Sequence, residues 1–579
     1  MGRGTRELGA RVGGVVRMSH KRATRFALPG LLLMLLASCG GGGSGSADLV
    51  PSGPQPAASA IELSVGSLDQ PFQASQRSYS ATQPFLVAEV EVRVDVPDDA
   101  KRVRLAGREV LPGQPSGPLP LRVGSNSIEI EIERPDSPAI GSYRLNVQRL
   151  APDSVVTTAE LREGNGLPDD SRQVQMALDG DRLALTTRTG SDLALLEVRI
   201  FRRDGEAWLE EAVLSAPDPD RPGGFGVGLA LHDDVLVVGQ SGHGNRASDE
   251  ESDFLPLLIG AVHVYRQQDE NWVLEESLLP PDPHMTQPFG VRAAVDDTLL
   301  VVGAPFETVF HDGVEKLWAG AIYVYIRGEA SWQFHSRYTA PEPATGALFG
   351  ESLALDSEHL VVTAPREGAG MPQPCIAGPG FFVEPPCPVD EGEGAVYVHV
   401  LEEGSVTASM RLDGLETGES GRLGSALAYD GVRIAASAPL AAPSGAVVVW
   451  RAAEGDWLKD AVLRPPPGID GIGAGMALDL AHGILALGVS RNDDGATGFD
   501  ATPSGDVVPG NGAVLLYERF ESTWLPPLVV KPPQALKRQQ FGEVVALEEG
   551  RLVVSQRPLE GAFAFPVTTE GEQALFFFR

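Results

Sequence analysis

Two spacings recur along this chain and limit what it can fold into. The first joins an opening Phe or Leu to the end of a second apolar run, as from Phe289 to Gly303. The second joins a glycine to a position usually held by tryptophan, as from Gly320 to Trp332. Because the spacings stay fixed while the loops between them vary, the chain is expected to be built of repeats. The first spacing recurs at 225–239, 349–363, 423–437 and 541–555 and is slightly longer at 472–488, and the second recurs at 260–272, 394–406, 445–457 and 512–524.

Each repeat is expected to form short antiparallel strands. Its apolar runs are four to six residues long, rich in β-branched and aromatic residues, and bounded by Gly, Pro or Asp, as at 299–302 and 320–325. The sequence has no long helical periodicity, which favours an all-β fold. A more divergent unit ends at Trp208, with strands expected at 174–178 and 183–187. We therefore predict seven units, beginning near residues 172, 225, 289, 349, 423, 472 and 541.

The two ends of the array predict a closed ring. The seventh unit ends with its third strand, 574–578, and the chain stops at Arg579. An orphan segment before the first unit, 155–161, has the pattern of the missing fourth strand. An amino-terminal strand that completes the last sheet would remove two exposed edges at once. The prediction is an all-β fold with a seven-bladed β-propeller over 151–579, closed by 155–161 against 574–578.

The order Phe-Gly, Gly-Ala-Pro (303–305) and Gly-Ala-x-x-Val-Tyr (320–325) resembles FG-GAP repeats, which form the propeller of integrin α-subunits and occur in bacterial surface proteins. The resemblance spans about residues 155–579. In that family calcium is held in the first-to-second-strand hairpin by an acidic loop of about nine residues. Here these hairpins are tight, as at 296–297, so that calcium site is not expected to carry over. Thr363, Ser437 and Ser555 also replace the Gly of Gly-Ala-Pro, and Val406 replaces Trp.

The segment 1–60 is expected to be a leader and a tether. Starting from Met18, a basic segment and an apolar run of about a dozen residues end at 36–39, Leu-Ala-Ser-Cys, which resembles the lipobox of bacterial lipoproteins. The resemblance implies that residues 1–38 are a signal peptide and that Cys39 carries lipid. An ordinary secretory leader is the alternative. Residues 39–60 are Gly/Ser/Pro-rich and are expected to be a flexible linker. Gly40 stands where Asp would signal inner-membrane retention, so an outer-membrane lipoprotein on the periplasmic face or cell surface is predicted.

Residues 61–150 alternate apolar and polar residues, as at 90–96 and 128–132, and are expected to form a small β-sandwich. The order of Phe72, Tyr79, a Gly-Ser-Asn turn at 124–126 and Tyr143 resembles bacterial cadherin-like sandwich domains. That resemblance implies no site residues.

Charge and motifs argue against several functions. The net charge of -32 repels phosphate backbones, so no nucleic-acid partner is expected. The chain has no nucleophile elbow, no phosphate-binding loop, and no paired histidines that would indicate zinc. We therefore expect a protein that is not an enzyme. The tryptophans of the repeats are predicted to pack between sheets rather than to stack on sugars.

Three features remain candidates for binding or stabilisation. Acidic residues in the loop of the sixth unit are a weak calcium candidate, with a solvated loop as the alternative: Asp493, Asp494, Asp500 and Asp506. Cys375 and Cys387 lie in one long loop and are expected to form a disulfide in an oxidising compartment. The long second-to-third-strand loops should gather on one face and carry aromatic side chains. We predict this as a ligand face, with loops that pack on themselves as the alternative: Phe254, Phe306, Phe310, Trp318, Phe381, Phe382 and Phe499.

These features favour a membrane-anchored binding or adhesion protein whose loop face takes a protein or glycan ligand. A periplasm-facing scaffold lipoprotein is the alternative. A weaker alternative is a carbohydrate-active propeller enzyme, which would need a converging pair of carboxylates.

Overall fold

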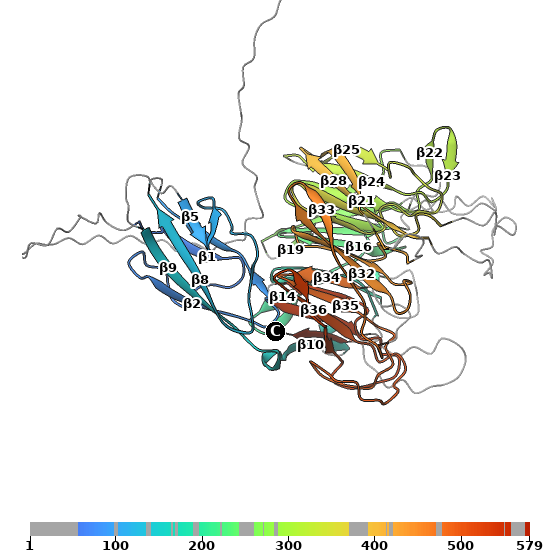
Figure 1. The fold of residues 1–579 in the computed structure, drawn as a ribbon. Helices are drawn as coiled ribbons and strands as arrows, with labels where there is room; N and C mark the ends of the chain where they lie inside the picture. Colours follow the sequence, from blue (N-terminus) through green and yellow to red (C-terminus); the bar gives the residue numbers. More distant parts are fainter. Residues whose placement is uncertain are drawn as a thin grey trace, which may run out of the picture. The chain divides into compact units, whose positions relative to one another are not determined.

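A computed structural model of the chain describes residues 56–97, 102–134, 140–163, 166–167, 172–188, 196–220, 223–241, 260–269, 271–282, 288–329, 331–369, 392–412, 414–415, 421–469, 477–548, 550–556 and 574–578. Over these residues the fold is all-β (Figure 1). The one helical turn among them is the 3-10 turn η1 (Pro152–Ser154). In the same residues no helix is long and apolar enough to cross a bilayer. The predicted leader, Cys39 and nearly all of the tether precede the described part of the chain.

The amino-terminal part contains one five-stranded sheet and two strand pairs. The sheet has the order β2 (Ser78–Gln83), β9 (Ile140–Arg149), β8 (Gly124–Glu133), β5 (Arg102–Leu105) and β6 (Arg108–Val110), with β2 parallel to β9. The pairs are β1 (Ala60–Leu63) with β4 (Val92–Asp95), and β3 (Glu89–Val90) with β7 (Leu119–Pro120).

Because apolar and polar residues alternate along these strands, their apolar side chains form one hydrophobic core. Every second residue of β9 is buried, and so are Ile128, Ile130 and Ile132 of β8. They pack on Ile61 of β1 and on side chains of β4 in one apolar cluster. The period-two pattern thus puts one face of each strand in the core and leaves the other polar.

The repeats form consecutive antiparallel sheets, which we number 1 to 7 in chain order within the described residues. Their strands are: sheet 1, β12 (Arg172–Asp179), β13 (Arg182–Arg188), β14 (Leu196–Asp204), β15 (Ala207–Leu214); sheet 2, β16 (Phe225–His232), β17 (Val235–Gln240), β18 (Ala261–Gln268), β19 (Asn271–Leu278); sheet 3, β20 (Arg292–Val295), β21 (Leu299–Ala304), β24 (Ala321–Arg327), β25 (Trp332–Tyr338); sheet 4, β26 (Leu353–Leu355), β27 (His359–Ala364), β28 (Ala395–Glu402), β29 (Ser405–Arg411); sheet 5, β30 (Leu427–Tyr429), β31 (Arg433–Ala438), β32 (Ala446–Ala453), β33 (Asp456–Leu463); sheet 6, β34 (Leu478–Ala481), β35 (Ile484–Gly488), β36 (Val514–Phe520), β37 (Thr523–Trp524), β38 (Leu528–Val530); sheet 7, β39 (Val545–Glu548), β40 (Arg551–Gln556), β41 (Ala574–Phe578).

The first strands of these sheets lie against one another in a ring. β12, β16, β20, β26, β30, β34 and β39 contact in that order, and β39 contacts β12. Sheets arranged around a ring of first strands are a β-propeller. The second strands β17, β21, β31 and β40 are buried at every position, as expected for strands covered by a neighbouring sheet on both faces.

The amino-terminal strand closes the ring. β10 (Thr157–Glu163) pairs antiparallel with β41, with Leu161 opposite Leu575 and Thr157 opposite Phe578. This pairing agrees with the one predicted for the orphan segment 155–161, except that the strand begins at Thr157. A short parallel strand, β11 (Gly166–Leu167), follows on β10. Figure 1 shows β10 beside the red strands of sheet 7, although β10 precedes all seven sheets in the chain and β41 is the last strand.

The repeat signature holds each sheet to the next. Phe289 and Phe349 are fully buried, and the glycines after them, Gly290 and Gly350, have φ of +86° and +94°, which side chains disfavour. A Cβ on Gly320 of sheet 3 would lie 2.1 Å from the carbonyl oxygen of Phe349, which opens sheet 4. The glycine of one sheet therefore makes room for the opening residue of the next.

The recurring tryptophans fill the spaces between neighbouring sheets. Trp208, Trp272, Trp332 and Trp457 are at most 8% exposed. Trp208 of sheet 1 stacks on Phe577 of sheet 7, with ring centroids 4.9 Å apart. This burial agrees with a packing role and leaves these four indoles no face for a sugar.

Candidate functional site

The two ends of the sheets differ in what covers them. One end carries the first-to-second-strand turns, and the other carries the second-to-third-strand loops. The sandwich contacts the turn end: the amides of Ala88 and Glu89 each donate to the carbonyl of His482, in the β34–β35 turn, over 3.0 Å. A Cβ on Gly550, in the β39–β40 turn, would lie 2.5 Å from Pro84. From the second-to-third-strand loops, Phe499 of sheet 6 also contacts the sandwich, at Phe85.

Two buried ion pairs hold the sandwich to the turn end. Glu89 contacts Arg433 of β31 at 2.6 Å, and both side chains are about 5% exposed or less. Arg149, fully buried at the end of β9, holds both carboxylate oxygens of Glu518, at 2.6 and 3.1 Å. Burial raises the pKa of Glu89, while Arg433 opposes that shift. The sandwich and the propeller each supply one acid and one arginine.

At the loop end, sheet 3 presents a hairpin with exposed apolar side chains. We call residues 306–318 the arm; its strands are β22 (Val309–His311) and β23 (Val314–Lys316), and it stands out from its sheet in Figure 1. Asp312 and Gly313 at its tip have φ of +52° and +76°, as a type I′ turn requires. Its large exposed apolar residues are Phe306 (37%), Phe310 (74%), Val314 (54%), Leu317 (44%) and Trp318 (39%).

Trp318 closes the arm in an unfavourable backbone conformation. Its φ is +53°, which is uncommon for a bulky residue and stores roughly 1–2 kcal/mol of strain. Its carbonyl accepts the amide of Leu348, and the carbonyl of Leu317 accepts that of Gly346. The surrounding chain thus holds a strained residue, a feature that gathers at functional sites.

A buried carboxylate anchors the base of the arm. Glu307 is 1% exposed. It accepts hydrogen bonds from the hydroxyl of Tyr323 at 2.8 Å and from Arg337, whose Nε lies 2.8 Å away. Burial, followed by the charge of Glu307, raises the pKa of Tyr323, so Tyr323 stays a hydrogen-bond donor at neutral pH. Two strand residues, Tyr323 of β24 and Arg337 of β25, therefore hold Glu307 at the point where the arm begins.

The same three residue types recur in sheet 4. Glu367 accepts the Tyr397 hydroxyl at 2.6 Å and Arg411 Nε at 3.0 Å. In both sheets the glutamate lies at the same place after the Ala-Pro pair, and the spacing from the tyrosine to the arginine is the same. Sequence reasoning missed this triad. Its signal was present as Ala-Pro-x-Glu, but the arginine becomes a partner only through the register of the third and fourth strands.

Removing the carboxylate should loosen the arm. Glu307→Ala leaves Arg337 and Tyr323 without their buried acceptor and is expected to lower the free energy of unfolding by about 2–4 kcal/mol. Chemical denaturation measures that loss, and amide hydrogen exchange should show faster exchange at 306–318. Glu315→Ala, an exposed carboxylate in the same arm, is the matched control and should change stability by less than about 0.5 kcal/mol. Equal effects of the two variants would contradict an anchoring role for Glu307.

The predicted ligand-face aromatics have different surroundings. Trp318, with Phe306 and Phe310, is exposed in the arm. Phe499 is half-buried, with its ring edge-on to Phe85 of the sandwich at 6.1 Å, and so lies apart from the arm. Phe254, Phe381 and Phe382 lie outside the described residues, as do Cys375 and Cys387 with their predicted disulfide.

In the acidic loop of sheet 6, the charged group surrounded by oxygen atoms is the ammonium of a lysine. The ammonium of Lys531, 2% exposed, donates to Asn492 Oδ1 and to the carbonyls of Asp494 and Gly512. The Asp494 carboxylate accepts backbone amides from 496, 504 and 505, and Asp493 accepts that of Gly510. These N–H groups take part of the acceptor capacity of Asp493 and Asp494. Among the described residues, the group of ligand atoms close enough to hold a metal ion contains none of the four acidic residues of this loop, so calcium binding here stays a prediction.

One mixed group of ligand atoms lies at the turn end. His232 and Asp233 of sheet 2 and Asp297 of sheet 3 place one donor atom each within 4.8 Å of the others. Asp297 is 80% exposed, and His232 Nε2 lies 3.4 Å from its carboxylate. Chain spacing did not reveal this group because its residues come from different sheets.

Comparison with known proteins finds similarity only at the level of the fold. No protein-family model matches the chain, and no curated protein matches its sequence. A prolyl endopeptidase structure is 11% identical, with a TM-score of 0.37, covering 87% of this chain and 55% of its own. The β-propeller domain of the Trilobed protease from Pyrococcus furiosus is 10% identical (TM-score 0.33), covering 67% of this chain and 91% of its own. A hypothetical selenium-binding protein from Sulfolobus tokodaii is 9% identical (TM-score 0.38), covering 67% of this chain and 83% of its own.

Proposed function

We propose that this protein is a non-enzymatic binding or adhesion protein of seven blades that takes a protein or glycan ligand on its loop end. The arm is the main observation that supports ligand binding at the loop end. Phe310, Val314 and Trp318 are all exposed in the arm, with Phe310 and Val314 on opposite faces of the hairpin, and its base is fixed by the buried Glu307. Exposed apolar side chains on a rigid support are typical of binding surfaces. The sandwich contacts described above involve sheets 5, 6 and 7 and no residue of the arm.

The membrane anchor forms the second part of the proposal. Acylation at Cys39 would hold the chain to the outer membrane, and residues 40–60 would carry the folded part away from the bilayer. The FG-GAP and cadherin-like resemblances agree with a surface role. Protease treatment of intact cells separates the two locations: digestion of the propeller supports surface exposure, and protection supports the periplasm-facing scaffold.

A binding comparison tests the proposed function. Labelled protein comprising residues 56–579 is added to envelope material from the source cells, and retention is measured at increasing concentration. Phe310→Ser should weaken saturable retention by about tenfold or more, because central aromatic residues dominate interfaces. Leu111→Ser, on the sandwich, is the matched control, since both residues are 74% exposed. Equal retention of the two variants, or hydrolase activity on a glycan and ester panel, would overturn the proposal.

A further inference from the structure

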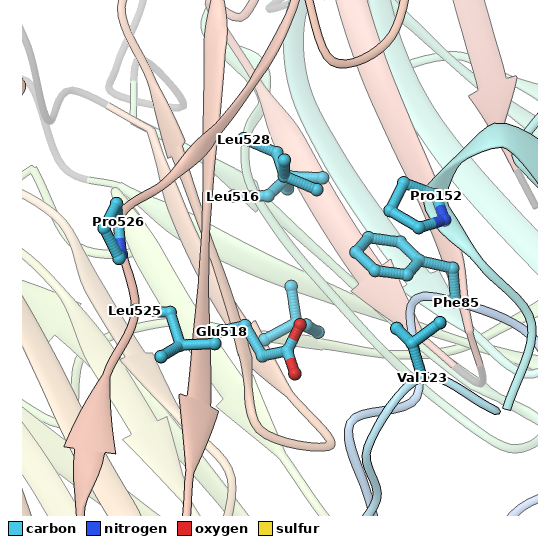
Figure 2. A pocket seen from close by; sticks show the side chains of 9 residues that line it. Phe85, Val123, Pro152, Leu516, Glu518, Leu525, Pro526 and Leu528 are labelled. Carbon is cyan, nitrogen blue, oxygen red and sulfur yellow. The ribbon is translucent and has the colours of Figure 1, made fainter. Parts of the chain in front are cut away.

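A cavity of about 180 Å³ lies between the sandwich and sheet 6. Phe85 and Val123 of the sandwich and Pro152 of η1 form one wall, and Leu516, Leu525 and Leu528 form the other. Figure 2 shows Glu518 between these two groups of apolar side chains. The cavity is independent of the arm and of the function proposed for it.

An interruption in the outer strand of sheet 6 gives the cavity its space. β37 ends at Trp524 and β38 begins at Leu528, whereas β33 of sheet 5 runs unbroken from Asp456 to Leu463. Pro526 and Pro527, between β37 and β38, have no N–H to donate to the third strand. The chain therefore leaves the ladder at this point, directly after Leu525, which lies at the rim and is 39% exposed.

Glu518 is the acidic group of the cavity, and its charge is already balanced. Arg149 binds both of its carboxylate oxygens, and the other N–H groups of Arg149 donate to the carbonyls of Phe85 and Leu121. Each carboxylate oxygen keeps a free lone pair after accepting one hydrogen bond. The cavity thus offers apolar walls, the Phe85 ring and one acceptor, and it disfavours anions.

We propose that this cavity binds a small, uncharged aromatic molecule with one hydrogen-bond donor, of which phenol is the simplest example. An apolar cavity of roughly 150 Å³ is sufficient for a benzene ring. The ring would fill the space between Phe85 and Leu516, and its O–H would donate to Glu518. Because the walls come from both the sandwich and the propeller, the bound molecule would hold the two together.

Phenol binding to the full chain tests the proposal by calorimetry and melting temperature. Phenol should bind saturably and raise the melting temperature, benzene should bind more weakly, and benzoate should not bind. Leu525→Trp should fill the rim and weaken phenol binding at least tenfold. Leu458→Trp is the matched control, because Leu458 follows Trp457 as Leu525 follows Trp524 and is similarly exposed.

The measured affinities of the two tryptophan variants show whether phenol binds at this cavity. Retained phenol affinity in Leu458→Trp with loss in Leu525→Trp supports the site. Equal affinity in both variants, benzoate binding as tight as phenol binding, or no saturable binding at millimolar phenol would overturn it. If Leu525→Trp does not fold, Val123→Trp on the opposite wall, where Val123 is 46% exposed, takes its place with the same expected loss.

Discussion

Deleting residues 151–162 is expected to destabilise the propeller and make it aggregate. The deletion removes most of β10, including Leu161, which packs on Leu575 and Phe577. β41 would then be an unpaired edge carrying Leu575 and three phenylalanines that are at most 5% exposed in the intact fold. With several apolar side chains losing their cover at roughly 1.5–3 kcal/mol each, the free energy of unfolding should fall by more than about 5 kcal/mol. Light scattering and thermal unfolding measure both effects.

A pair of point variants tests closure by β10 without removing any part of the chain. Leu161→Asp puts a charge where the side chain is 6% exposed, and Val156→Asp puts the same charge where it is 57% exposed. The first should unfold at a much lower temperature, and the second should behave like the wild type. In a background without the natural cysteines, Arg162→Cys with Ala574→Cys, which are register partners, should cross-link and stabilise by up to about 6 kcal/mol. A monomeric deletion variant with an unaltered melt would contradict closure by β10.

Replacing Arg149 should have the second-largest effect. Arg149→Ala leaves the Glu518 carboxylate and the carbonyls of Phe85 and Leu121 without their donors in a buried junction. Removing one partner of a buried ion pair is expected to lower the free energy of unfolding by about 3–5 kcal/mol. Urea denaturation of the protein comprising residues 56–579 measures the change.

The matched control lies on the same strand. Arg144 of β9 is 60% exposed and forms its ion pair with Glu129, which is 65% exposed. Arg144→Ala should change stability by less than about 1 kcal/mol, because solvent screens such pairs. If both arginine variants lost the same small amount, the junction would not be the buried, ion-paired contact described above.

Much of the propeller could be predicted from local signals. The glycines at 290 and 320 mark places where the backbone has positive φ and where a Cβ would collide with a neighbouring carbonyl, so the repeat motif reflects packing. The alternation along β8 and β9 defined the sandwich core in the same way. The arm was interpreted as a loop, although Asp312-Gly313 between two short runs is a known hairpin signal.

The site was harder to predict because its contacts join distant residues. Glu307 meets Arg337 only after the third and fourth strands pair in register, and His232 meets Asp297 only after two sheets lie side by side. Phe499 was predicted to face a ligand, but its ring lies against Phe85. No local pattern indicates where the sandwich docks, so that contact and the cavity beside it could not be predicted from the sequence.

Photo-cross-linking from the arm tests the central claim, that the loop end meets a ligand, most directly. A photoreactive phenylalanine analogue is placed at Phe310 in the full chain, and at Leu111 as the equally exposed control, in the source cells. The binding account predicts a discrete covalent adduct from position 310, with none of the same mass from position 111. Absence of an adduct at 310, or the same adduct from both positions, would contradict it.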